Sequence, residues 1–248
     1  MMPLAPAVFS SASALLDDLT PDSGLTLRRW TPDEFRRMAS SELLSTEEAL
    51  ELIDGEIMDR YSRAPRLFHR SEYYNLTNFG LLGPEERTEL IYGRIITRMS
   101  PMRRPHSLGI IKTAEAVQTA FGNEAAVEQQ MPLHVKSGIE PEPDVVVLQG
   151  LSEDYLDAPY PADVLLLVEV SYSTLRYDRN TKAAIYAENG ISDYWIVDLH
   201  SRALEVRRDP ENGKYVSLRV YGEDEAVAPL AAPNESIKVA DLLSIVRG

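Results

Sequence analysis

The chain of 248 residues contains no cysteine. This absence excludes disulfide scaffolds, thiolate zinc sites, iron–sulfur clusters and cysteine nucleophiles. A catalytic metal would have to be held by oxygen or histidine, which favours magnesium or manganese. Long apolar runs of membrane-spanning length are also absent, and the first 20 residues lack the basic residues of a signal peptide. We therefore expect a soluble, cytoplasmic protein without membrane contact.

Basic residues are few. Lys and Arg number 25 against 39 Asp and Glu, which gives a formal net charge of −14. This balance excludes a uniformly basic nucleic-acid-binding surface. Hydrophobic residues make up 44% of the chain and charged residues 26%, so a disordered or fibrous protein is also excluded. The length suits one sizeable domain with a small appendage.

The arginines that are present are clustered. Residues 60–71 contain four arginines and no acid, and residues 90–114 contain Arg94, Arg98 and three further basic residues without an acid. One interpretation is that both segments face phosphate groups. The other is an ordinary solvated surface whose balancing acids come from elsewhere in the fold.

A short internal sequence repeat lies near the N-terminus. Residues 1–24 are small, rich in Ser, Ala and Pro, and predict a flexible arm. ELIDGEI (51–57) then recurs 38 residues later as ELIYGRI (89–95), and each copy predicts a short helix, a turn and a strand that crosses a glycine. Two copies are too few for a solenoid. We expect a partial duplicate of the leading element over residues 25–70, serving as an edge strand, a dimer contact or nothing, ahead of one domain over residues 71–248.

The rest of the chain predicts alternating helices and strands. Apolar spacing indicates the helices, and continuous β-branched runs indicate buried strands. The expected elements are a helix over 106–121, a strand over 125–135, buried strands over 144–148 and 164–170, a helix over 178–189 with Asp178 as N-cap, and a strand over 193–198.

Two carboxylates are expected to meet at one edge of the sheet. Asp144 opens the first buried strand, and Glu169 lies near the end of the second. The connection over residues 149–163 fits an antiparallel return, in which the start of one strand faces the end of the other. Glu169 is the only charge in its apolar run, and a lone buried carboxylate is costly unless a partner compensates it.

A lysine is expected to reach these two carboxylates, whose place at the edge of the sheet we call the carboxylate corner. If the strands around residues 178–189 are parallel, the crossover is right-handed and the helix begins beside Glu169. Lys182 lies in the first turns of that helix, with Tyr186 one turn later on the same face. Two acids that hold a divalent cation, with an ammonium group beside them, suit phosphodiester hydrolysis. The alternative is a salt bridge between Lys182 and Glu169 that only permits burial.

These residues lie in stretches that resemble a known family. PEPDVVVL (141–148) and VLLLVEVSYSTLRYDRNTKAAIYAENGISDYWIVD (164–198) resemble the Uma-type endonucleases, a bacterial branch of the PD-(D/E)XK restriction-endonuclease-like superfamily. ELIYGRIITRMSP (89–101) is similar to the leading segment of that family. The resemblance covers roughly residues 72–248. It implies an α/β fold of the mixed α+β kind, in which helices flank a central mixed β-sheet, and Mg²⁺-dependent (or Mn²⁺-dependent) phosphodiester hydrolysis.

The resemblance also implies roles for single residues. Asp144 corresponds to the motif aspartate, Glu169 to the motif acid, and the Val170 carbonyl to an extra metal ligand. The usual lysine position, two residues after the acid, is occupied by Ser171. The family pattern of a lysine that has migrated to the following helix matches Lys182.

Other residues are weaker candidates. His106 matches a histidine common in such proteins and either contacts phosphate or a ligand, or is a surface residue at a helix start. Glu142, Gln130 and Glu115 are possible neighbours of the metal, each with a plain surface or turn role as the alternative. Tyr194 and Trp195 are expected in the core rather than as base-stacking residues. The histidines without metal-ligand spacing are His69, His134 and His200.

The sequence therefore predicts a Mg²⁺-dependent endonuclease acting on DNA. Asp144 and Glu169 would bind the metal, and Lys182 would assist the attacking water. The alternative is a non-catalytic DNA-binding or oligomerising protein on a nuclease scaffold. Cleavage of RNA or another phosphodiester is a third possibility, which no recognisable RNA-binding module favours. A homodimer would allow two sites to cut two strands.

Overall fold

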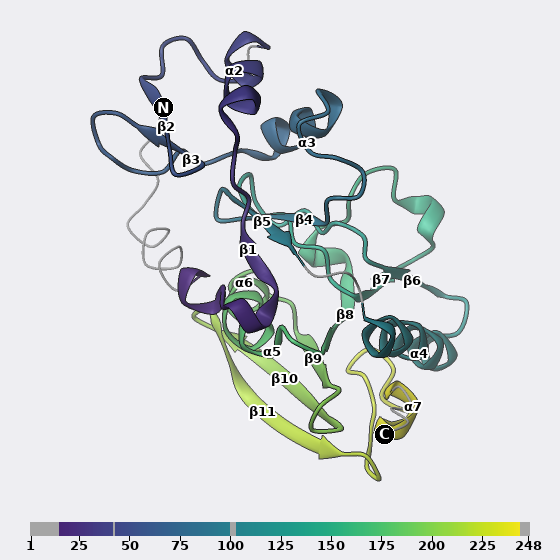
Figure 1. Cartoon of the computed structure of the whole chain (residues 1–248). Coiled ribbons are helices and arrows are strands. Elements are labelled where there is room, and N and C mark those ends of the chain that lie inside the picture. The colour runs from purple at the N-terminus through teal and green to yellow at the C-terminus, as the bar shows by residue number, and fades with distance from the viewer. Residues whose placement is uncertain (1–14, 42, 100–102, 244–248) are drawn as a thin grey trace.

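A six-stranded mixed sheet forms the centre of the computed structural model, which describes residues 15–41, 43–99 and 103–243 (Figure 1). The strand order is β11-β10-β9-β8-β7-β6. Only β8 and β9 are parallel, and the other neighbours are antiparallel, as expected for the two pairs around β8. The strands are β6 (Ala125–Gln129), β7 (Val145–Gln149), β8 (Val164–Ser171), β9 (Asp193–Asp198), β10 (Ala203–Glu211) and β11 (Lys214–Gly222).

Helices cover both faces of this sheet. Alternate residues of β8 point to opposite faces, so Val168 packs with α4, while Leu167 packs with α6. Tyr194 and Trp195 are fully buried, as expected. None of the described helices is long and apolar enough to cross a bilayer. The helical elements are α4 (Arg104–Phe121) and α7 (Val239–Leu242) on one face, and α5 (Leu175–Tyr177), the π-helical turn η4 (Asp178–Lys182) and α6 (Ala183–Glu188) on the other.

Two predicted boundaries are wrong. The helix after β8 begins at Leu175, so Asp178 is not its N-cap and lies inside the π-helical turn instead. Its carboxylate accepts a hydrogen bond from Thr174 Oγ1 at 2.7 Å. The strand expected over 125–135 ends at Gln129, because Gln130 has a φ of 54°, which breaks the extended backbone.

The sequence repeat is also a structural repeat with the same 38-residue offset. Gly55 and Gly93 occupy hairpin turns rather than strands, and each follows a residue that also has positive φ, as in a type I′ turn. The first copy (residues 28–61) contains α2 (Pro32–Ser40), β2 (Leu50–Ile53) and β3 (Glu56–Asp59). The second copy (residues 66–99) contains α3 (Arg70–Asn78), β4 (Thr88–Ile91) and β5 (Arg94–Arg98).

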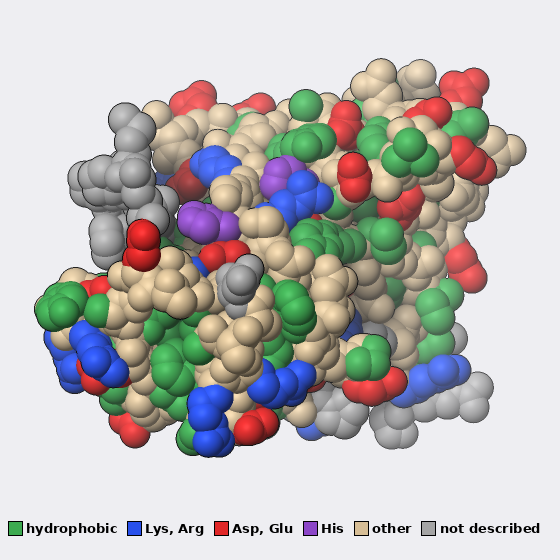
Figure 2. All heavy atoms as spheres, turned by 90° about the horizontal axis from the view of Figure 1, so that it is seen from above, with side chains coloured by type: hydrophobic (Ala, Val, Ile, Leu, Met, Phe, Trp, Pro, Cys, Tyr) green, Lys and Arg blue, Asp and Glu red, His purple; other side chains and the backbone are tan. Residues whose placement is uncertain are grey.

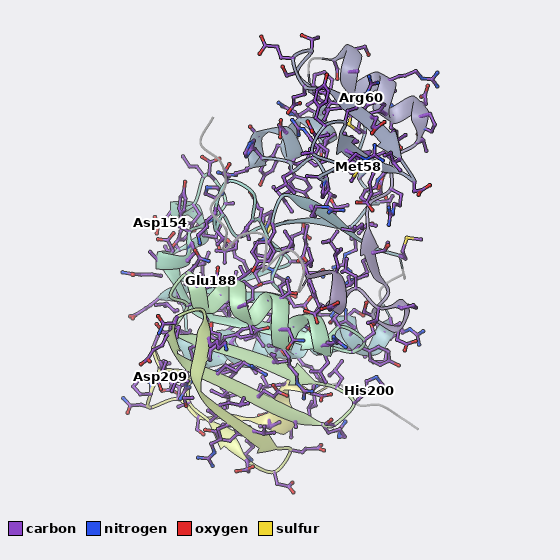
Figure 3. The ribbon with its side chains drawn as sticks, turned by 90° about the vertical axis from the view of Figure 1, so that its left-hand side faces the viewer. Met58, Arg60, Asp154, Glu188, His200 and Asp209 are labelled. Carbon is purple, nitrogen blue, oxygen red and sulfur yellow. The ribbon has the colours of Figure 1, made fainter. Side chains whose placement is uncertain are left out.

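The two copies share one core and exchange ion pairs symmetrically. Figure 3 places Met58 and Arg60 of the first copy at the opposite end of the molecule from Asp209 of the six-stranded sheet. Equivalent buried residues pack together: Trp30 and Phe68, Met38 and Leu76, Leu43 and Leu81, Leu44 and Leu82, and Ile57 and Ile95. Arg28 pairs with Glu34 of its own copy and Glu86 of the other, and Arg66 pairs in the same way with Glu72 and Glu48.

Residues 15–24, expected to belong to a flexible arm, pack against the core instead. Leu15 is fully buried, and the Asp18 side chain is hydrogen-bonded to α5 and η4. A short helical turn, η1 (Pro21–Ser23), leads into β1 (Leu25–Leu27), which pairs antiparallel with β5. Residues 1–14 of the expected arm lie outside the described residues. The division of the chain into parts at residue 70 stays a prediction.

Candidate active site

Asp144 and Glu169 meet at one edge of the sheet, as the sequence predicts. The register of β7 and β8 pairs Val145 with Val168, so the next positions along, Asp144 and Glu169, are opposite each other. The backbone N–H of Asp144 donates to Glu169 Oε2 at 3.3 Å, and the N–H of Val170 donates to Asp144 Oδ2 at 2.9 Å. Both side chains are buried, so the corner is more enclosed than an open carboxylate pair.

Lys182 reaches this corner from the π-helical turn. Its Nζ lies 3.0 Å from Glu169 Oε1 and 2.6 Å from Glu89 Oε1. Tyr186, one turn further along, donates its hydroxyl to Glu169 Oε1 at 2.7 Å. Although burial opposes the charge, Glu169 and Glu89 raise the pKa of Lys182 above its ordinary value. Lys182 is therefore a cation, suited to orienting water and offsetting negative charge rather than to accepting a proton.

His106 touches the other acid. Its Nε2 lies 3.2 Å from Asp144 Oδ2, and the ring is buried at the start of α4 rather than exposed on the surface. Burial opposes ionisation of Asp144, but the hydrogen bond from His106 and the charge of Arg98 outweigh it and hold the pKa of Asp144 below its ordinary value. Burial raises the pKa of Glu169 to about 8, despite Lys182. The two acids therefore differ in proton affinity.

Three further acids belong to the corner: Glu89 and Asp178 were missed as site residues, and Glu142 was expected only as a weaker candidate. Glu89 opens the repeated ELIYGRI motif, and its carboxylate accepts from Lys182, from the Glu142 N–H and from the Tyr177 hydroxyl. Burial, with the charge of Glu89 adding to it, raises the pKa of Glu142 to about 7. Asp178 is buried beside Lys182 in the same turn. The signal for Glu89 was its place in the motif, whereas nothing in the sequence marks Asp178 as part of the corner.

The carboxylates of the corner outnumber its cations. Among the described residues, five carboxylates face three permanent cations: Lys182, Arg87 and Arg98. The raised pKa values of Glu169 and Glu142, about 8 and about 7, mean that without a metal these two acids hold protons at neutral pH. With all five acids ionised, the surplus would be two negative charges, which is the charge of one divalent cation. Asp144, Glu169, Glu89, Glu142 and Asp178 are the carboxylates.

The donor set fits a hard divalent cation. No group of three or more His, Cys, Asp or Glu side chains in the described ranges has the geometry of a metal site. Asp144 and Glu169 would instead be joined by the Val170 carbonyl. The Val170 N–H donates to Asp144. Because the carbonyl of a strand residue points to the same side as its N–H, the Val170 carbonyl also points to the side of β8 where Asp144 lies. Water would complete the shell, which Mg²⁺ accepts readily.

The weaker candidates are distributed between the corner and the surface. Gln130 lies beside the corner, because its N–H bonds to the carbonyls of Pro143 and Asp144. Glu115 is exposed on α4 and is not part of the corner. Ser171, at the usual lysine position, is buried, and its hydroxyl has no hydrogen-bond partner among the described residues. The three other histidines contact Ser137 (His69), Glu140 (His134) and Tyr172 (His200).

Three of the four arginines in residues 60–71 pair with acids from elsewhere in the fold, which favours the alternative of an ordinary surface for this segment. Arg63 pairs with Glu51, Arg66 with Glu72 and Glu48, and Arg70 with Glu140. In the second segment Arg94 pairs with Glu56, whereas Arg98 faces the corner. Figure 2 shows acidic, basic and hydrophobic side chains interspersed among the described residues of one face, without a continuous basic surface there.

The chain is similar in sequence to one protein family and in fold to one solved structure. Residues 68–240 match the Uma2 family, described as "Putative restriction endonuclease". A crystal structure of a putative nuclease belonging to DUF820, from Anabaena variabilis ATCC 29413, matches with a TM-score of 0.52 and 17% identity, over 71% of this chain and 97% of that chain. This likeness confirms the expected fold, a mixed sheet flanked by helices. The chain has no match among curated proteins. The family match begins in the second copy, so the first copy lies outside it.

Proposed function

Because the chain belongs to the Uma2 restriction-endonuclease family, we propose that it is a metal-dependent nuclease that hydrolyses phosphodiester bonds in DNA. The observation that supports this proposal most strongly is the buried corner itself. The Glu169 carboxylate accepts from the Asp144 backbone N–H, and the Asp144 carboxylate accepts from the Val170 backbone N–H. Lys182 contacts Glu169 at 3.0 Å. Burying these charges is costly, and the surplus of carboxylates leaves a place for a cation.

Each residue has a defined role in this proposal. Asp144, Glu169 and the Val170 carbonyl would hold Mg²⁺ or Mn²⁺, which polarises a phosphoryl oxygen and lowers the pKa of bound water. Lys182 stays protonated, orients the attacking water and offsets the charge that develops on the phosphoryl oxygens. His106 keeps Asp144 ionised and oriented through its 3.2 Å contact.

Cleavage assays with matched variants test the proposal. Asp144→Asn and Glu169→Gln should each reduce Mg²⁺-dependent cleavage of plasmid DNA by at least 100-fold, because each removes a charged metal ligand. Glu115→Gln, an exposed acid on α4, is the control and should cut like the wild type. Circular dichroism checks that each variant folds. Wild-type cleavage in EDTA, or full activity of both variants, would refute the proposal. RNA of the same sequence tests the substrate class.

The alternative is a non-catalytic DNA-binding or oligomerising protein on this scaffold. The observation in its favour is that Lys182 is already held by Glu89 and Glu169, while Ser171 replaces the usual lysine. Calorimetric titration with Mg²⁺ separates the two functions: DNA binding with neither metal uptake nor cleavage supports the alternative. Light scattering in the same buffers tests the predicted homodimer.

A further inference from the structure

Two arginines border the carboxylate corner on one hairpin. Arg87 directly precedes β4 and Arg98 ends β5, and the Arg98 N–H donates to the Arg87 carbonyl at 3.1 Å. The register of this hairpin pairs Thr88 with Thr97, so the two arginines are opposite each other. Opposite residues of an antiparallel pair point to the same face. Glu89, which holds Lys182, is two positions from Arg87 and therefore shares that face.

Arg87 and Arg98 have no carboxylate partner among the described residues. In the described part of the chain, no acid forms an ion pair within 4.0 Å with Arg87 or Arg98. Arg87 Nη1 is buried and has no hydrogen-bond partner among the described residues. Arg94, on the same hairpin, shows the contrast, because it pairs with Glu56.

Two features of this arrangement are unfavourable for Arg87 and would be relieved by a bound anion. Two like charges directly opposite each other on a hairpin repel, and a buried donor without an acceptor costs about 1–3 kcal/mol. Arg98 lowers the pKa of Arg87, in addition to the larger effect of burial, which is the signature of this repulsion. The carboxylates of the corner attract Arg98 from a distance but do not contact it.

We propose that Arg87 and Arg98 form a phosphate-binding site that holds the nucleic-acid backbone beside the carboxylate corner. The identity of the ligand rests on the proposed function. Guanidinium groups bind phosphate through paired N–H donors, and two of them on one face can contact several phosphate oxygens at once. The ionised carboxylates of the corner repel phosphate, so the site should bind phosphate more tightly once a divalent cation is present.

Binding of inorganic phosphate is the direct test. Calorimetric titration of the wild type with inorganic phosphate, in the presence of Mg²⁺, should show saturable binding. Arg87→Gln and Arg98→Gln should each weaken it at least 10-fold. Arg36→Gln, which removes an exposed arginine of α2, should leave it unchanged. Arg98→Lys keeps the charge without the paired donors, so it tests the site if Arg98→Gln fails to fold. Absence of phosphate binding by the wild type, or wild-type affinity in the arginine variants, overturns the inference.

Binding of a DNA oligonucleotide in EDTA adds a second measurement. The slope of log K against log salt should fall by about one for each arginine removed. Phosphate binding through both arginines without DNA cleavage would refute the nuclease and keep the phosphate site. Metal-dependent cleavage with an unchanged KM and salt dependence in both arginine variants would keep the nuclease and refute the site.

Discussion

Replacing Asp18 with alanine should destabilise the protein and loosen the turn that carries Lys182. The Asp18 carboxylate is 2% exposed. It accepts hydrogen bonds from Arg176 Nε at 3.1 Å, Asn180 Nδ2 at 2.9 Å and Thr181 Oγ1 at 2.6 Å. These donors lie on both sides of the junction between α5 and the π-helical turn, and Thr181 is the neighbour of Lys182. A π-helical turn is rare and needs such support.

The expected magnitude follows from the exposure of the three donors. Arg176 and Asn180 are exposed and can turn to water when Asp18 is removed, so they lose little. Thr181 is buried, and its hydroxyl would be left without its acceptor, which costs about 1–3 kcal/mol. Loss of the hydrogen bonds to the charged Asp18 carboxylate adds to this cost. Removal of a buried charge offsets part of the cost. We expect Asp18→Ala to lower the free energy of unfolding by about 2–3 kcal/mol.

Urea denaturation measures this change, and the neighbouring acid supplies the control. Asp17 is exposed, so Asp17→Ala makes the same charge change and should alter stability by less than about 0.5 kcal/mol. The midpoint should fall for Asp18→Ala with an unchanged m-value. Hydrogen exchange should be faster at residues 178–182 in this variant. Equal midpoints for the two variants would refute the docking of residues 15–24 on the π-helical turn.

Two further predictions concern an acid and a glycine. Burial raises the pKa of Asp178 from 3.8 to about 6, so its ionisation opposes folding, and this penalty develops as the pH rises from about 4 to 6. Asp178→Asn should therefore stabilise the protein by up to about 3 kcal/mol at pH 8 and by nothing at pH 4. Urea unfolding at both pH values measures this change. Equal stabilisation at the two pH values would contradict the raised pKa of Asp178. Gly93→Ala should destabilise by about 2 kcal/mol or more, because Gly93 has a φ of 74° and a Cβ would lie 2.7 Å from Leu67 Cβ. Gly83→Ala, where φ is not positive and the nearest atom is 3.8 Å away, is its control in thermal melting.

The sequence predicted the parts of the fold that depend on local pattern. The buried strands around Val146 and Leu167 have the expected positions because continuous β-branched runs have few alternatives to a sheet interior. The antiparallel pairing of β7 with β8 followed from the connection between them, and the parallel pairing of β8 with β9, a condition of the predicted right-handed crossover, is present in the structure. The π-helical turn could not be predicted, because its extra residue is supported by Asp18, some 160 positions earlier in the chain. Asp178 therefore looked like an N-cap, although the helix begins three residues before it.

The candidate corner was predictable in its main residues and not in its surroundings. Asp144, Glu169 and Lys182 lie on adjacent elements, so strand direction alone brings them together. Glu89 comes from a separate three-stranded sheet. Its contact with Lys182 depends on how that sheet packs on the main one, which no local pattern encodes. The enclosure of the corner has the same origin, since the hairpin that carries Glu89 also supplies Arg98.

A segment free of acids in the sequence is not free of acids in space. Arg66 illustrates this, because its partners Glu48 and Glu72 lie 18 and 6 positions away and are brought together by the packing of the two copies. Arginine density therefore identified two segments without separating the paired arginines from the unpaired ones. The useful measure is whether a guanidinium keeps a carboxylate partner after folding. By this measure Arg98 differs from Arg66, although both belong to acid-free segments. The phosphate contacts of this acidic protein should therefore come from a few uncompensated arginines at the corner rather than from an extended basic surface.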